Sequence, residues 1–149
     1  FGLEYVGEDG ERHRPIIVHR GVISTLERMV ALLIEECEGN FPLWLAPQQA
    51  VVIPIADRHI EYAQSVAAQL KALGLRAEVD ARGERMNAKI RDAQMRKVPY
   101  MLIVGDREAE AKAAALRVRG GGDKGAVPVV EIVERLRRER DEKALTLWD

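Results

Sequence analysis

Ala50-Val51-Val52-Ile53-Pro54-Ile55-Ala56 is a nearly continuous apolar run, and it decides the fold of most of the chain. A strand with helices packed on both faces is apolar at every position, whereas a strand with one wet face alternates. The run therefore predicts a strand buried on both faces. Tyr100 to Val104 has the same character and is followed by Gly105-Asp106, which predicts a second buried strand.

The segments around these two runs alternate between helical and strand patterns. Asp57 is a candidate cap for a helix that ends at Gly74, and a basic helix is expected over 85–97. Further strands are expected over 76–80 and 115–119, a tight turn or mobile loop over 120–125, and a last helix from Pro128, at its first position, to about Lys143. This alternation predicts an α/β domain over 48–149, with a small mixed, largely parallel sheet flanked by helices.

The first residues follow a different pattern. Leu3 to Val6 and Arg14 to His19 are strand-like, and the turn residues between them predict a β-hairpin. Apolar residues recur at helical spacing from Thr25 to Glu38, and Gly39 is a plausible stop. Two prolines make 40–47 a stiff connector, so we divide the chain into 1–39, the connector 40–47 and 48–149.

Composition limits the classes of function. The 149 residues carry a formal net charge of −1, so a nucleic-acid site must be a local basic patch. One cysteine, Cys37, excludes an internal disulfide, and beside Glu35 and Glu36 we interpret it as inert. No apolar run is long enough to span a bilayer and no signal peptide is visible, so we expect a cytoplasmic protein without a membrane partner. Because the sequence does not begin with Met, we expect it to belong to a longer polypeptide.

The residues offer little for independent catalysis. His13, His19 and His59 have no metal-ligand spacing with one another or with Cys37. Gly120-Gly121-Gly122 lacks the lysine spacing of a phosphate-binding loop. We therefore expect any catalytic role to depend on residues outside this sequence.

His19-Arg20-Gly21-Val22-Ile23-Ser24-Thr25-Leu26-Glu27-Arg28 resembles motif 3 of class II aminoacyl-tRNA synthetases, in the form found in the threonyl family. It keeps one glycine where the generic motif has more, which disfavours the histidyl, prolyl and glycyl families. The resemblance implies that His19 is one of three zinc ligands, the others lying upstream, and that this zinc holds the amino and hydroxyl groups of threonine. It also implies that Arg28 contacts ATP and that Thr25 lines the adenylate pocket.

The second half is similar to the anticodon-binding domain shared by several class II synthetases. Three segments carry the similarity, namely 44–49, 89–93 and 97–106, and it extends through Glu108 to Arg119. The similarity implies that Glu108 and Arg117 contact anticodon bases, which a carboxylate and a planar guanidinium suit chemically. Arg119, on the same strand face as Arg117, and Arg91 complete the expected basic patch. Lys89 and Arg96 we interpret as part of a solvated helix face.

Together these resemblances imply a C-terminal piece of a threonine–tRNA ligase that recognises the anticodon loop of tRNA(Thr). The parent enzyme would be a cytoplasmic homodimer using threonine, zinc, and ATP with Mg²⁺. This chain alone is expected to be catalytically incomplete and to hold neither zinc nor ATP. The alternative is a non-catalytic module of the same fold, such as a polymerase accessory subunit or a small-ligand α/β domain.

Overall fold

The computed structural model describes residues 2–23 and 25–148, and Ser24 of the motif lies outside them. The chain forms two compact units, residues 1–32 and 33–149, which are described separately. The division falls within helix α1 (Leu26–Glu36), ahead of the connector that the prolines indicated.

The first unit contains a short antiparallel hairpin of β1 (Tyr5–Val6) and β2 (Arg12–His13), with Tyr5 opposite His13. The hairpin prediction is confirmed, but the second strand was expected over 14–19 and that position is wrong. Residues 14–20 have no regular structure, and Ile16 and Val18 are 93% and 80% exposed. A strand-like sequence needs a neighbouring strand for its backbone hydrogen bonds, and the described residues supply none there.

Helix α1 begins where the sequence predicts and ends two residues early. The hydroxyl of Thr25 accepts a hydrogen bond from the backbone N–H of Arg28 at 3.4 Å, as an N-terminal cap does. At the other end Gly39 has a φ of 72° and its N–H donates to the carbonyl of Ile34. Glycine reaches this left-handed conformation without a steric cost, so the helix stops there.

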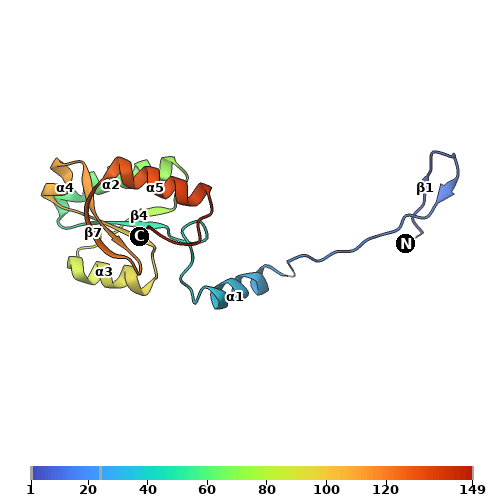
Figure 1. Ribbon diagram of the computed structural model, residues 1–149, viewed down its shortest axis with the longest axis horizontal. Helices are drawn as coiled ribbons and strands as arrows, with labels where there is room; N and C mark the ends of the chain where they lie inside the picture. The colour runs from blue at the N-terminus through green and yellow to red at the C-terminus, as the bar shows by residue number, and fades with distance from the viewer. Residues whose placement is uncertain (1, 24, 149) are drawn as a thin grey trace. The chain divides into compact units, whose positions relative to one another are not determined.

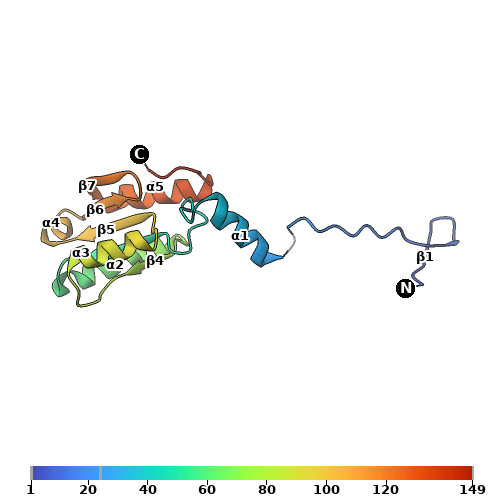
Figure 2. The same cartoon turned by 90° about the horizontal axis from the view of Figure 1, so that it is seen from below.

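The second unit is built on a five-stranded sheet in the order β4-β3-β5-β6-β7 (Figure 2). The strands are β3 (Ala50–Pro54), β4 (Ala77–Val79), β5 (Tyr100–Val104), β6 (Ala113–Val118) and β7 (Gly122–Pro128). β3 pairs in parallel with β4 and β5, whereas β6 is antiparallel to β5 and β7. The mixed α/β prediction is confirmed, although the antiparallel share is larger than expected because β7 was not foreseen.

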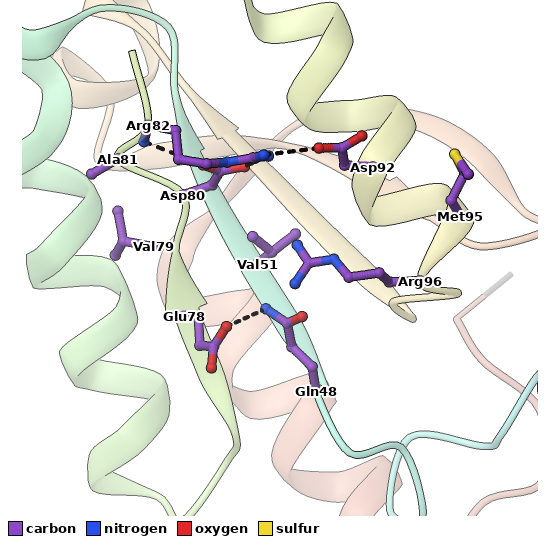
Figure 3. A pocket seen from close by; sticks show the side chains of 10 residues that line it. All are labelled: Gln48, Val51, Glu78, Val79, Asp80, Ala81, Arg82, Asp92, Met95 and Arg96. Carbon is purple, nitrogen blue, oxygen red and sulfur yellow. Dashed lines mark hydrogen bonds and ion pairs between the residues drawn. The ribbon is translucent and has the colours of Figure 1, made fainter. Parts of the chain in front are cut away.

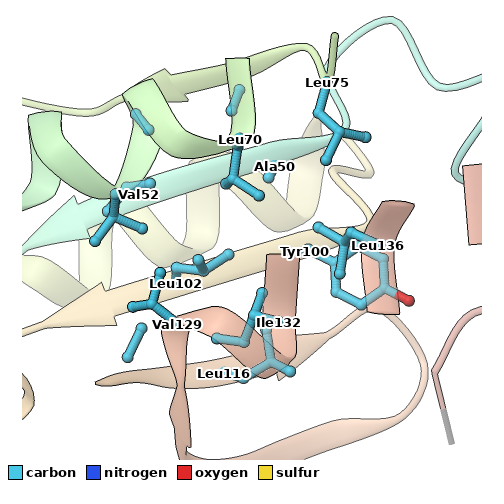
Figure 4. Packing of buried hydrophobic residues seen from close by; sticks show 14 of the residues in the cluster. Ala50, Val52, Leu70, Leu75, Tyr100, Leu102, Leu116, Val129, Ile132 and Leu136 are labelled. Carbon is cyan, nitrogen blue, oxygen red and sulfur yellow. The ribbon is translucent and has the colours of Figure 1, made fainter. Parts of the chain in front are cut away.

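Helices cover both faces of this sheet (Figure 1). α2 (Ile60–Ala72) and α5 (Val129–Asp141) lie on one face, and α3 (Met86–Met95) lies on the other. Val52, Tyr100 and Leu116 face α2 and α5 in one core (Figure 4), whereas Val51 and Met101 belong to a second core with α3. Both faces of β3 are therefore buried, which explains why its sequence is apolar at every position.

Several local predictions are corrected. A short 3-10 turn (Asp57–His59) precedes α2, and there the ring Nδ1 of His59, not Asp57, accepts from the N–H of Ala56 at 3.2 Å. Pro128 precedes α5 as its N-cap residue. Gly122 to Gly125 belong to β7 although glycine disfavours strands, and a register shift at Leu116/Arg117 accommodates them. Helix α4 (Asp106–Glu110) was missed because five residues give no periodic signal.

The connector is held by arginine and lysine side chains that donate to backbone carbonyls. Arg76 donates to the carbonyls of Trp44 at 3.1 Å and Ala46 at 2.7 Å. Arg119 donates to the carbonyls of Phe41 and Lys97, both at 2.6 Å, and Lys97 donates to the carbonyl of Glu38. These bonds replace the regular backbone hydrogen bonds of a helix or strand, which an irregular segment lacks.

The C-terminal segment is tied to the core by a buried tyrosine. The hydroxyl of Tyr100, which is fully buried, donates to Glu139 Oε2 at 2.6 Å and accepts from the N–H of Trp148 at 2.8 Å. Burial, and then the bond to Glu139, raise the pKa of Tyr100 well above its usual value, so the hydroxyl stays protonated. One side chain therefore joins β5, α5 and the end of the chain.

Replacing Arg119 with Gln is expected to lower the free energy of unfolding by about 1–3 kcal/mol, because two backbone carbonyls lose a charged donor. Urea unfolding followed by circular dichroism measures this. Arg91→Gln, on the exposed face of α3, is the matched control and should stay within about 0.5 kcal/mol of the unchanged chain. Equal urea midpoints for the two variants would contradict the role of Arg119 in holding the connector.

Replacing Tyr100 with Phe is expected to cost about 1–3 kcal/mol, since it removes one partner of the buried Glu139 and of the Trp148 N–H. It should also speed hydrogen exchange of the Trp148 amide. Tyr5→Phe, at a 53% exposed position, is the control and should change neither quantity. An unaltered unfolding midpoint for Tyr100→Phe would show that the bond contributes nothing.

Candidate nucleic-acid interface

Arg117 lies on the α3 face of the sheet, opposite Met101 on β5. It borders an open hollow of about 410 Å³. The hollow is lined by residues of α3, β5, β6, the following turn and β7, namely Gln94, Val98, Met101, Arg117, Val118, Arg119, Gly120, Gly122 and Asp123. An apolar floor with a guanidinium at its side is suited to a flat, polar-edged ligand.

The guanidinium of Arg117 is held by Asp123 of β7, with Nε 3.2 Å from Oδ2. Oδ1 of the same carboxylate accepts from the N–H of Gly125 at 2.9 Å. The two side chains of the ion pair are 39% and 51% exposed. Exposed pairs of this kind contribute little stability, so a ligand can replace Asp123 as the partner of Arg117 at small cost.

The turn beside Arg117 leaves room for a ligand. Gly120 and Gly122 have φ values of 76° and 77°, a conformation that favours glycine. A Cβ at either position would meet no atom within 4 Å, so the backbone is open on that side. A ligand can therefore approach the turn closely.

Arg119 lines the same hollow, but its guanidinium is committed to the carbonyls of Phe41 and Lys97. Burial lowers its pKa, and it joins the sheet to the connector. The alternation of side chains along β6 was the basis for predicting that Arg119 contacts tRNA. That pattern gives the face of the strand correctly but says nothing about distant carbonyls.

Glu108 lies in α4, beyond the carboxyl end of β5. Its Oε2 accepts from the N–H of Gly105 at 3.0 Å and so caps the helix. A Cβ at Gly105 would lie 2.8 Å from Cδ1 of Ile55 and 2.9 Å from Oε2 of Glu108, so a larger residue would have to displace these side-chain ends. Glu108 does not line the hollow of Arg117, and its carboxylate is half-buried.

The basic face of α3 is smaller than expected. Arg91 is exposed there but does not line the hollow of Arg117. Lys89, interpreted from the sequence as solvated, is 5% exposed and donates to the carbonyl of Asp80 at 3.0 Å. That interpretation is wrong because Lys89 lies between Met86 and Ala93 on the helix side that packs on the sheet.

Sequence reasoning missed a charged cluster at the carboxyl ends of β3 and β5. Arg58 donates to both carboxylate oxygens of Asp106, at 2.9 and 2.5 Å, and Nε2 of His59 lies 2.8 Å from Oδ1. Arg58 and then His59 lower the pKa of Asp106. The sequence signal that could have indicated this cluster is the presence of polar residues directly after two buried strands. The cluster joins the two loops.

The motif residues that the structure describes, 19–23 and 25–28, are exposed. His19 lies in a segment without regular structure, and Arg28 lies in the first turn of α1, whose cap is Thr25. Among residues 2–23 and 25–148, no group of three or more His, Cys, Asp or Glu side chains could hold a metal ion. His19 therefore makes no zinc site with the described residues. None of the described helices has the length and apolarity needed to cross a membrane.

Comparison with known proteins gives consistent matches. The chain is 54% identical to threonine–tRNA ligase of Natranaerobius thermophilus over 142 residues, which are 95% of this chain and 22% of that protein. It is 51% identical to threonine–tRNA ligase of Thermus thermophilus, over 97% of this chain and 22% of the relative. The chain thus spans about a fifth of the length of these curated relatives.

A solved structure agrees with the fold. The RNA binding domain of threonyl-tRNA synthetase from Cryptosporidium parvum Iowa II superposes with a TM-score of 0.76 at 32% identity, covering 91% of this chain and 34% of that one. The resemblance to the threonyl family of class II synthetases is confirmed by these matches. Because residues 49–139 match the family model described as the anticodon binding domain, the chain belongs to the anticodon-binding domain family.

Proposed function

We propose that this chain binds the anticodon loop of a tRNA through the hollow beside Arg117. The observation that carries the proposal is the half-exposed guanidinium of Arg117, paired with the exposed Asp123, over an apolar floor and beside an open glycine turn. Anticodon bases are unpaired, so they present both their edges and their flat faces to such a site.

The chemistry of Arg117 suits an unpaired base. Its guanidinium donates two parallel hydrogen bonds or stacks on a ring, and Val98 and Met101 supply apolar contact. The carboxylate of Glu108 uses Oε2 for its helix cap, which leaves Oε1 to accept from a base amino group. Arg91 adds a positive charge on α3 for the backbone, whereas Arg119 supports the site from behind.

We further propose that the chain serves a threonine–tRNA ligase, as its relatives' names suggest. That enzyme would use threonine, ATP with Mg²⁺ and tRNA(Thr) in the cytoplasm, as a homodimer. In it His19 would be one of three zinc ligands, with Arg28 at ATP and Thr25 at the adenylate pocket. Zinc would bind the amino and hydroxyl groups of threonine, and the hydroxyl distinguishes threonine from valine. Since the described residues offer His19 alone, the other ligands must come from elsewhere, and we expect no adenylate formation by this chain.

Arg117→Gln is expected to weaken binding of a stem-loop with a threonine anticodon about tenfold or more and to abolish its preference over one altered at the second and third anticodon bases. Titration of labelled stem-loops at fixed salt measures both. Arg137→Gln, exposed on α5 across the sheet, removes the same charge and should change the affinity less than about twofold. Equal affinity of the unchanged chain for both anticodons would sink the proposal.

In the full-length enzyme, His19→Ala is expected to remove bound zinc and threonine-dependent ATP–pyrophosphate exchange while tRNA affinity stays unchanged. Elemental analysis gives the zinc content independently of activity. His13→Ala serves as the control, because His13 is paired with Asp9 in the hairpin. Full zinc content in the His19 variant would rule out the ligand assignment.

A further inference from the structure

A second hollow, of about 570 Å³, lies on the same face of the sheet, between α3 and the strands β3 and β4. Figure 3 shows the side chains around it. They are Gln48, Val51, Glu78, Val79, Asp80, Ala81, Arg82, Asp92, Met95 and Arg96. No role suggested by the motifs uses this hollow.

One end of the hollow is closed by charged side chains that form hydrogen bonds and ion pairs with one another. Arg82 donates to both oxygens of Asp80, at 2.9 and 2.7 Å, and to Asp92 at 2.9 Å. These bonds lower the pKa of Asp80 and raise that of Arg82, so these two groups stay ionised. This end is therefore a fixed wall that has no net attraction for a phosphate.

The other end presents groups that are open to a ligand. Arg96 extends from the end of α3 toward Val51, and its guanidinium has no hydrogen-bond or ion-pair partner among the described residues (Figure 3). Gln48 donates to Glu78 at 3.0 Å across the same opening. Met95, 72% exposed, stands at the rim. A planar cation, an amide, a carboxylate and two apolar side chains thus surround one space.

We propose that this hollow binds a second unpaired base of the same RNA, which deepens the proposed function and rests on it. The face of the Arg96 guanidinium stacks on the ring, with the exposed Met95 in apolar contact. Glu78 accepts from an exocyclic amino group and Gln48 supplies a donor and an acceptor, which selects guanine, cytosine or adenine over uracil, because uracil has no amino group. The near-balanced charge of the lining favours a base over a phosphate.

The position of α3 links the two hollows. Gln94 lines the hollow of Arg117, and the next two residues, Met95 and Arg96, line the second hollow. The last turn of α3 therefore separates them, and a single strand crossing this turn would place one base on each side. Lys97, at the turn that follows, donates to the carbonyl of Glu38.

The test pairs protein variants with a series of threonine-anticodon stem-loops in which each loop base in turn is removed. For the unchanged chain, removal of either of two different bases should each weaken binding about tenfold. For the Arg96→Gln variant, removal of one of these two bases should no longer weaken binding. For the Arg117→Gln variant, removal of the other base should no longer weaken binding. Glu78→Gln should reduce the loss of affinity caused by removing the base assigned to Arg96, and it should leave the loss for the Arg117 base unchanged.

Arg137→Gln, on the opposite face, removes one charge and should leave both losses intact. If Arg117→Gln removes one loss while Arg96→Gln only weakens every RNA equally, the second base site is refuted and the proposed function stands. If neither variant alters any loss, both are refuted. If Arg96→Gln alters the affinity for a free mononucleotide but no loss in the loop series, the hollow is a small-ligand site and the RNA assignment is wrong.

Discussion

The backbone carbonyls of residues 38–47, which lie outside any strand, are the constraint on which the second unit depends. This segment is irregular because of its prolines, so its carbonyls have no ladder to join. Arg76, Arg119 and Lys97 supply the donors, and Leu43 beneath them is fully buried. A charged donor gives a stronger bond than a neutral one, and the long side chains reach across the surface to the segment. The connector is thereby part of the folded unit and not a flexible tether.

Using cations in this way leaves fewer of them for a ligand. The chain is nearly neutral, and Lys89, Arg82 and Arg58 are also occupied by carbonyls or carboxylates of the fold. A broad electrostatic attraction for RNA is therefore not available to it. Recognition must come from a few placed groups, which is the arrangement at Arg117 and Arg96. In the proposed complex, contact with individual bases would contribute more to the affinity than contact with the phosphate backbone.

The sequence predicted those parts of the fold that local patterns encode. The buried runs at β3 and β5 are apolar at every position, and the helices α1, α2, α3 and α5 have clear periodicity. β7 was not foreseen because Gly122 and Gly125 are poor strand residues, and its place depends on pairing with β6. The strand expected over 14–19 is absent although its residues favour a strand, because the sequence pattern does not supply a strand for it to pair with.

For the site, motif resemblance selected Arg117, and the structure places it in an open hollow. Arg119 was added because it alternates onto the same strand face, and that pattern could not separate the roles of the two arginines. The difference depends on a carbonyl at Phe41, 78 residues away in the chain. The hollow of Arg96 was missed because Gln48, Glu78 and Arg96 come from three separate elements and form no motif.

The division of helices between the two faces explains why both hollows lie where they do. α2 and α5 together cover one face of the five strands, and their core contains the larger buried cluster. On the other face α3 is the one long helix among the described residues, and it packs over β3 and β5 in the middle of the sheet. A single helix is about 10 Å wide, whereas five strands span about 20 Å. The strands on either side of α3 are therefore left uncovered, β4 on one side and β6 with β7 on the other. The two hollows follow from this incomplete cover, and each combines an apolar floor with polar side chains such as Glu78 and Arg117.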